Sequence, residues 1–122
     1  MNYSKRDQAI RLLKEYTKSE SLIKHSLAVE SCMRFYAKLN NEDEDLWGIT
    51  GLLHDFDYEM FPNPQEGGHP YKGESILKEK GYPNLIREAI MGHATFTNVP
   101  RETSLAKHLF ACDELRNRKS VV

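Results

Sequence analysis

The chain has 122 residues, and its 17 lysines and arginines nearly balance its 18 aspartates and glutamates. A chain of this length forms one domain with a real core, and its balanced charge argues against extended nucleic-acid binding, so any phosphate recognition must be local. No apolar stretch reaches the ~20 residues of a membrane span and the start lacks a signal-peptide block, so we expect a cytoplasmic protein that binds no membrane.

The spacing of the apolar residues predicts an all-α fold of about six helices, because they recur at intervals of three and four in almost every segment. No run alternates strictly enough to predict a strand. The first helix follows Ser4, with Asp7 completing a weak capping pattern, and directs Ile10, Leu13 and Tyr16 toward the core.

The second and third helices place two histidines near the core. The second helix spans about Ser21 to Leu39, and its apolar stripe includes His25. After a polar turn at residues 40–42, the third helix ends by delivering the adjacent residues His54 and Asp55. Their side chains diverge on a regular helix, but at a helix end the backbone can turn both inward.

Proline and glycine residues between Phe56 and Gly68 predict a surface loop, and loops of this kind often form the rim of a site. Pro70 fits the first position of a fourth helix that ends near Lys80, which leaves His69 at the N-cap. Histidine is a poor N-cap, and the positive end of a helix disfavours its charged form, which suits a neutral metal ligand.

The last two predicted helices add a histidine and an aspartate. Pro83 begins a fifth helix, whose apolar stripe includes His93, and the sixth spans about Ser104 to Arg116 with Asp113 on its apolar side. Cys32 and Cys112 are too few and too far apart in the sequence for a disulfide framework or a zinc knuckle, so we interpret both as small buried hydrophobic residues.

Six residues form the predicted site. A single histidine on an apolar helix face is more often a core residue than a ligand, but here four histidines and two aspartates lie on apolar stripes or at helix ends. Burying the Asp113 carboxylate among apolar neighbours costs several kcal/mol unless a cation compensates it. A divalent metal ion is the simplest such cation. The predicted ligands are His25, His54, Asp55, His69, His93 and Asp113.

The ligand types limit the choice of metal. Asp55 has two oxygens and can bridge two ions, whereas the imidazole of His54 binds one. Mixed nitrogen and oxygen ligation suits Fe, Mn, Co, Ni or Zn better than Ca or Mg. The fifth histidine, His108, lies roughly 140° around the helix from Asp113, so we assign it to the surface, away from the site.

The segments IKHSLAVE, GLLHDFDYE and LFACDEL resemble the metal-binding motifs of the HD-domain (HDIG-type) metal-dependent phosphohydrolases. HPYKGESILKEKGYP and IMGHATF resemble further histidine segments of the binuclear branches. The resemblance covers most of residues 22–115 and implies a compact HD helical bundle. It also implies that His25, His54, Asp55 and Asp113 hold a first metal, and that Asp55, His69 and His93 hold a second.

The implied activity is hydrolysis of a phosphate ester or anhydride in a small substrate, which could be a nucleotide, by a metal-activated water at Asp55. Lys72, one turn beyond His69, could bind a phosphate, although an exposed lysine on a solvated face is the simpler interpretation. Asp57 and Tyr58 could position water or substrate, or could simply form the loop.

Two departures from the family pattern lead to further expectations. Gly81, Tyr82 and Pro83 precede His93 instead of following a His-His-Glu segment, so we do not infer the cyclic-dinucleotide phosphodiesterase activity of the proteins named for GYP. Similar HD proteins continue with more helix where this chain has the basic stretch from Arg116 to Lys119. We therefore treat residues 1–122 as a single HD domain and expect a truncation after residue 115 that removes part of the pocket wall.

Two other functions remain open. Mixed-valence di-iron oxygenases that resemble inositol oxygenase use a similar set of four histidines and two aspartates. A degenerate HD domain could instead bind metal or nucleotide without turnover, as a regulatory or assembly module. The sequence leaves the substrate and a homo-oligomeric state undecided.

Overall fold

The computed structural model describes residues 5–118, which form six α-helices, two short 3-10 helices and no strand. This confirms the predicted all-α fold. In chain order the elements are α1 (Lys5–Tyr16), α2 (Glu20–Leu39), α3 (Glu44–Leu53), η1 (Pro64–Glu66), α4 (Tyr71–Glu79), α5 (Asn84–His93), η2 (Thr95–Thr97) and α6 (Ser104–Arg118).

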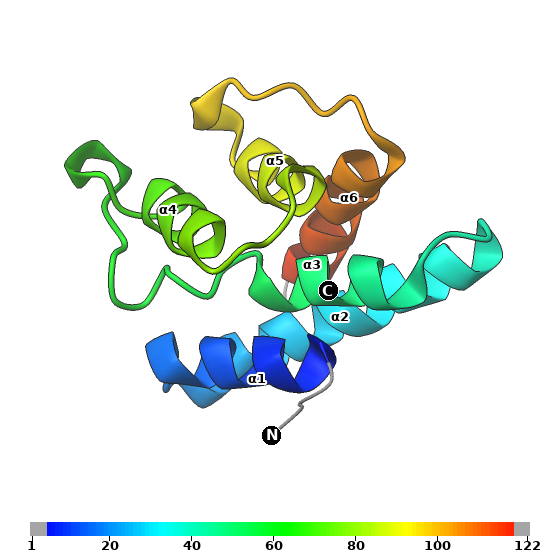
Figure 1. Ribbon diagram of the computed structural model, residues 1–122, viewed down its shortest axis with the longest axis horizontal. Coiled ribbons are helices and arrows are strands. Elements are labelled where there is room, and N and C mark those ends of the chain that lie inside the picture. Colours follow the sequence, from blue (N-terminus) through cyan, green and yellow to red (C-terminus); the bar gives the residue numbers. More distant parts are fainter. Residues whose placement is uncertain (1–4, 119–122) are drawn as a thin grey trace.

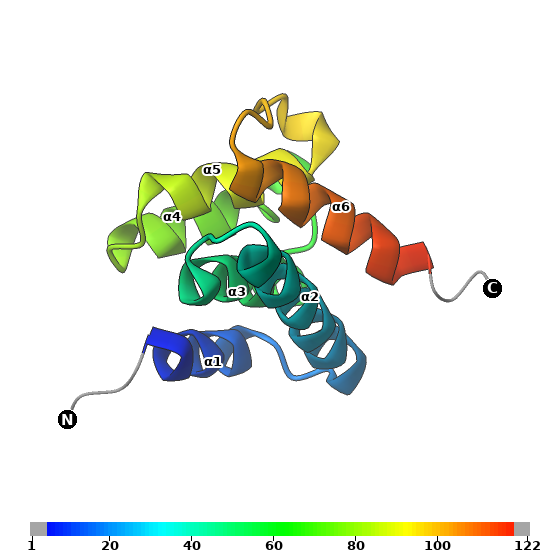
Figure 2. The ribbon, with the colours of Figure 1, turned by 90° about the vertical axis from the view of Figure 1, so that its right-hand side faces the viewer.

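The helices lie in three tiers, and α3 is at the centre. Figures 1 and 2 show α1 on one side of the pair α2 and α3, and α4, α5 and α6 on the other. Every residue of α3 from Trp47 to Leu53 is buried. A helix that is enclosed on all sides is expected to be apolar around its whole circumference, as this one is. The C-terminal end of α3 therefore lies in the core, between the tiers.

Side-chain caps fix where the two central helices begin. The Ser19 hydroxyl accepts a hydrogen bond from the backbone N–H of Leu22 at the start of α2, and the Asp43 carboxylate accepts one from Leu46 at the start of α3. Such caps satisfy backbone donors that the first turn of a helix leaves without partners. Helix α2 thus begins at Glu20, one residue before the predicted start.

The segment after α3 differs from the predicted surface loop at its beginning. Phe56 and Asp57 are buried, and the Thr17 hydroxyl donates a hydrogen bond to the carbonyl of Phe56 across 3.0 Å. The apolar ring of Phe56 belongs to the core, so only the later part of the segment lies at the surface. Gly67 has a φ of 76°, a left-handed conformation that glycine adopts without strain, and it ends η1.

The start of α4 also differs from the prediction. Its N-cap is Pro70, so His69 lies one residue before the cap instead of at it, and its ring contacts side chains outside α4. At the other end of the chain α6 extends two residues beyond the predicted end, to Arg118. Ser4 and Lys119, to which we assigned the first cap and the end of the basic stretch, lie outside the described residues.

No helix within residues 5–118 has both the length and the apolar character that crossing a bilayer requires. Cys32 and Cys112 are both buried and free, as predicted. Burial raises the pKa of the Cys112 thiol, so this sulfur stays protonated at neutral pH. Both cysteines therefore behave as small hydrophobic residues of the core.

A buried ion network joins the first three helices. Glu30 of α2, whose side chain is only 5% exposed, accepts two hydrogen bonds from Arg6 of α1, at 2.7 and 3.0 Å, and one from Arg34 at 3.0 Å. Arg34 also donates to Asp45 of α3 across 2.9 Å. A carboxylate this deep is tolerated because two guanidinium groups compensate its charge.

Removing the central carboxylate of this network should destabilise the fold. We expect Glu30→Ala to lower the free energy of unfolding by about 3 kcal/mol or more, because it removes the buried carboxylate that Arg6 and the mostly buried Arg34 share. Arg6→Ala, at a side chain that is 44% exposed, should cost about 1 kcal/mol or less. Urea denaturation of the metal-free protein measures both, and equal costs would contradict this account.

Candidate metal centre

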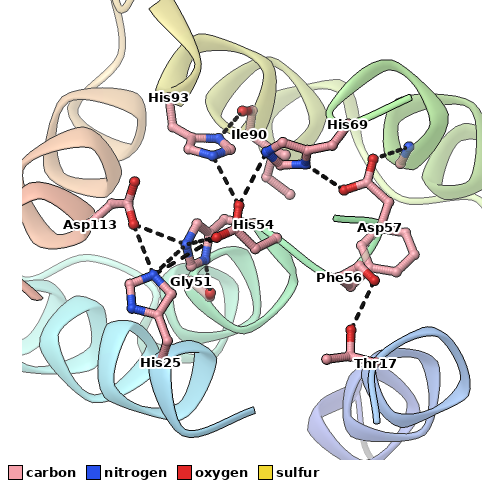
Figure 3. Close-up of polar contacts among 12 residues, drawn as sticks. Thr17, His25, Gly51, His54, Phe56, Asp57, His69, Ile90, His93 and Asp113 are labelled. Carbon is pink, nitrogen blue, oxygen red and sulfur yellow. Dashed lines mark hydrogen bonds and ion pairs between the residues drawn. The ribbon is translucent and has the colours of Figure 1, made fainter. Parts of the chain in front are cut away.

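Five parts of the chain contribute side chains to one polar cluster in the core (Figure 3). His25 comes from α2, and His54 and Asp55 come from the C-terminal end of α3. His69 precedes α4, His93 is the last residue of α5, and Asp113 is on α6. The structure thus brings together all six side chains that the sequence grouped, and their role as metal ligands stays a prediction.

One half of the cluster gathers around Asp113. Its Oδ1 lies 3.0 Å from His25 Nε2 and 3.2 Å from His54 Nε2, and these two nitrogens are 3.2 Å apart. Asp55 completes the group through Oδ2, 3.4 Å from His54 Nε2 and 3.9 Å from His25 Nε2. One ligand atom from each of these four residues lies within 4.8 Å of the others.

The other half uses the second oxygen of the same aspartate. Asp55 Oδ1 lies 3.2 Å from His69 Nε2 and 3.3 Å from His93 Nε2. These three residues form a second group whose ligand atoms also lie within 4.8 Å of one another. Because each oxygen of Asp55 faces a different group of histidines, this carboxylate has the geometry of a bridge between two cations.

Three of the four imidazoles are held from behind. His54 Nδ1 pairs with the carbonyl of Gly51 at 2.6 Å, His93 Nδ1 with the carbonyl of Ile90, and His69 Nδ1 with Asp57 Oδ1 at 2.6 Å. Since carbonyl and carboxylate oxygens only accept, each Nδ1 must be the N–H donor. In the neutral imidazole this leaves the Nε2 lone pair directed at the cluster, which is the form that binds metals.

The spacing and chemistry of the donors fit a transition-metal ion. Two donors bound to one ion at about 2.1 Å lie about 3.0 to 3.4 Å apart when the angle between the bonds is about 90° to 110°. The contacts within the cluster fall mostly in this range. The side chain of His54 is fully buried, while that of Asp55 is 21% exposed, so a solvent path reaches the middle of the cluster.

Opposite charges compensate one another inside the cluster. Burial alone lowers the pKa of His54, but the carboxylates of Asp55 and Asp113 outweigh it, so the pKa of His54 is raised well above its usual value. Burial raises the pKa of Asp55, yet the charge of His54 and hydrogen bonds from His54 and His93 hold it well below its usual range. The pKa of Asp113 is also lowered, since hydrogen bonds from His25 and His54 outweigh its burial. The two carboxylates therefore favour the protonated form of His54 when no metal is bound.

The residues proposed to contact substrate lie in different surroundings. Lys72 is exposed, and its ammonium group lies 5.1 Å from the centre of the Phe61 ring. Tyr58 is 45% exposed, and the centre of its ring is 5.6 Å from that of His69. Asp57 is buried, with one oxygen on His69 and the other on the backbone N–H of Gly73 at 2.7 Å. Only Tyr58 and Asp57 therefore touch a member of the cluster.

His108 lies away from the cluster, as the helical angle predicted, but it is half-buried instead of exposed. Its ring centre is 4.9 Å from that of Trp47 and 5.5 Å from that of Tyr36. A cavity of about 570 Å³ lies elsewhere as well, beside Lys5, Asp45 and Tyr82, and none of the six cluster residues lines it. Neither feature belongs to the candidate centre.

The groups that hold the imidazoles were not among the residues predicted from the sequence. His54 and His93 both bond to the carbonyl three residues earlier in their own helix. A histidine placed at the last turn of a helix can reach such a carbonyl, so this signal was present in the sequence. The bond from Gly73 to Asp57 joins residues 16 positions apart and had no comparable signal.

Comparison with known proteins gives one match. The family model described as HD domain matches residues 22–118 of this chain. The matched segment includes all six residues of the cluster, and among the described helices only α1 lies wholly outside it. No curated protein and no solved structure matches the chain significantly.

Binding of a metal ion should release protons at neutral pH. The raised pKa of metal-free His54 keeps this imidazole protonated there, and a ligand nitrogen must lose its proton to bind. Affinity for Zn²⁺ or Co²⁺ should therefore weaken as the pH falls from about 8 to about 6. Calorimetric titrations in two buffers with different ionisation enthalpies measure the released protons. Identical apparent enthalpies in the two buffers would show that His54 gives up none.

Proposed function

This chain belongs to the HD-domain family, whose members are mostly metal-dependent hydrolases, and from this premise we propose that it hydrolyses a phosphate ester or anhydride. The proposed cofactor is one or two transition-metal ions, Fe, Mn, Co, Ni or Zn. The proposed substrate is a small molecule that contains a phosphate, with nucleotides among the candidates.

The convergence of four Nε2 atoms on two carboxylates is the observation that supports this proposal best. His25, His54 and Asp113 would hold one ion together with Asp55, and His69 and His93 would hold a second through the other oxygen of Asp55. A purely structural cluster would not need three imidazoles with Nδ1 fixed and Nε2 turned to a common centre. Metal sites need this arrangement, because the bond at one nitrogen sets which nitrogen binds.

A divalent ion bound there lowers the pKa of a coordinated water from 15.7 to about 7 and neutralises charge on the phosphoryl oxygens. The residues of the chain place this chemistry. Asp55 keeps its charge at neutral pH because its pKa is depressed, so it is available as a shared anionic ligand. The buried ring of His54 keeps water from the inner side of the cluster. Substrate would therefore approach Asp55 from the partly exposed side.

The proposal assigns different roles to the three residues that were considered as substrate contacts. Lys72, on the first turn of α4, remains a candidate phosphate contact, since this residue is exposed. Asp57 has both oxygens bonded within the protein, so we no longer propose that it contacts substrate. Tyr58 lies against His69 with nearly half of its surface exposed, and it would border the path of the substrate.

Replacing Asp55 tests the proposal, because this residue serves both groups. We expect Asp55→Ala to lose the second ion and to hold the first more weakly. Phosphate release should fall by more than about 100-fold, because losing a direct ligand should cost more than the roughly 10- to 100-fold lost with an outer partner. His108→Gln, a histidine change outside the cluster, should keep metal content and turnover. Metal analysis of protein purified without chelator, and phosphate release from p-nitrophenyl phosphate and a nucleotide panel, measure these effects.

Other outcomes would replace the proposal. Full turnover in Asp55→Ala would rule out this site. A di-iron centre that consumes O₂ and releases no phosphate would favour the oxygenase alternative, which spectroscopy of the iron identifies. Bound metal without turnover on any substrate of the panel would favour a non-catalytic module that binds metal or nucleotide.

A further inference from the structure

We propose that Asp57 is a positioning residue that fixes the tautomer and the direction of His69, and that Gly73 is glycine so that this carboxylate can be held in place. The inference rests on the proposed binding of a second ion by Asp55, His69 and His93. From the sequence, Asp57 was expected either to position water or substrate or simply to form the loop; the proposed role is a different one.

The position of Asp57 relative to His69 is the first argument. Figure 3 shows Asp57 beside the His69 ring, and the two nitrogens of this ring face different carboxylates. Asp57 Oδ1 lies 2.6 Å from His69 Nδ1, while His69 Nε2 lies 3.2 Å from Asp55 Oδ1. Both nitrogens of the ring therefore contact a carboxylate: Nδ1 contacts Asp57, outside the cluster, and Nε2 contacts Asp55, which both halves of the cluster share.

The hydrogen-bond count gives the second argument. The side chain of Asp57 is only 2% exposed, so an ionised carboxylate here must find its partners inside the protein. Its Oδ2 accepts from the backbone N–H of Gly73, and its Oδ1 faces His69 Nδ1. An ionised carboxylate can only accept, so the bond forms only if Nδ1 carries the proton. Asp57 thereby reserves the Nε2 lone pair for a metal.

The location of His69 explains why a side chain has this role. His54 and His93 end their helices and use a backbone carbonyl three residues earlier. His69 does not end a helix, because η1 ends before Gly67 and α4 begins at Tyr71, and its Nδ1 pairs with Asp57 instead of a helical carbonyl. The acceptor for its Nδ1 has to come from elsewhere in the fold. Asp57, in the middle of the turn that follows α3, occupies that place.

The close approach of α4 gives the third argument. A Cβ at Gly73 would lie 2.8 Å from Asp57 Oδ2, 2.9 Å from its Cγ and 3.2 Å from Phe56 Cε1. The Asp57 side chain is buried and bonded to His69, so a Cβ that displaced its carboxylate would disturb this bond. A glycine at position 73 thus lets the backbone of α4 touch the carboxylate and lock it.

The substitution Asp57→Asn separates positioning from other roles. Asparagine keeps the size of the side chain but offers one acceptor and one donor, so it cannot accept from both Gly73 and His69. If the amide N–H₂ faces His69, Nδ1 must become the acceptor and the proton must move to Nε2. A protonated Nε2 has no lone pair for a metal. We expect the affinity for the second Co²⁺ to fall by about 10- to 100-fold, as when an outer partner of a ligand is lost, while the first Co²⁺ binds as before.

Glu59 offers a matched control. This carboxylate lies in the same segment and also bonds through both oxygens, to the backbone N–H groups of Lys18 and Ser19. It contacts none of the six cluster residues. Glu59→Gln should leave both Co²⁺ affinities within about twofold of the wild type, within the effect of an ordinary surface substitution. Calorimetry and Co²⁺ absorption spectra report the two binding steps, and circular dichroism verifies that both variants fold.

A measurement on the unmodified protein protects the test against misfolding of Asp57→Asn. Long-range ¹⁵N–¹H correlation spectra distinguish the two tautomers of each histidine. We expect a proton on His69 Nδ1 in both the metal-free and the zinc-loaded protein. Gly73→Ala should displace the Asp57 carboxylate, so we expect it to lower the affinity for the second ion in the same way as Asp57→Asn.

Three results would overturn the inference: an unprotonated Nδ1 in His69, unchanged affinity for the second ion in Asp57→Asn, or equal loss in Glu59→Gln. Failure of the proposed function is a separate result. If the wild type binds no second ion, the metal proposal fails for that group, whereas the His69 tautomer in the metal-free protein still reports whether Asp57 holds the ring.

Discussion

The placement of Asp55 just after the buried C-terminal part of α3 is the constraint on which the rest of the structure depends. Its carboxylate sits where four imidazoles meet, and the buried charge is tolerated only if positive charge accompanies it. Helices α2, α5 and α6 and the segment before α4 must each approach closely enough to supply a partner. Packing of apolar side chains brings the tiers together, while the cluster specifies how the tiers are aligned.

Backbone carbonyls orient the imidazoles of His54 and His93. At the ends of α3 and α5 a carbonyl three residues earlier accepts the Nδ1 proton, so the helix itself selects the tautomer. His69 lies between two helices and ends neither, and its Nδ1 is held by the carboxylate of Asp57, which Gly73 leaves room for. The two halves of the centre thus differ in how they are built, and the half around His69 depends on the docking of α4.

Much of this could be inferred from sequence because helical periodicity and local chemistry are short-range properties. Stripes of apolar residues placed His25, His93 and Asp113 on buried faces, and the HD pair marked the end of α3. The prediction was less accurate where the deciding contact lies far away in the chain. Phe56 and Asp57 follow a helix and precede a proline-rich segment, which suggests a surface loop, yet Thr17 and Gly73 hold them in the core.

Local sequence patterns sufficed for the all-α fold, the approximate bounds of the helices and the six polar residues on apolar stripes or at helix ends. Only the tertiary structure decided that Asp55 divides its two oxygens between two groups of histidines, and that Asp57 serves His69 instead of facing solvent. The physical reason is that a pattern along one helix tells which side is buried. Which donor meets which acceptor depends on how separate helices pack, at a precision of a few tenths of an ångström.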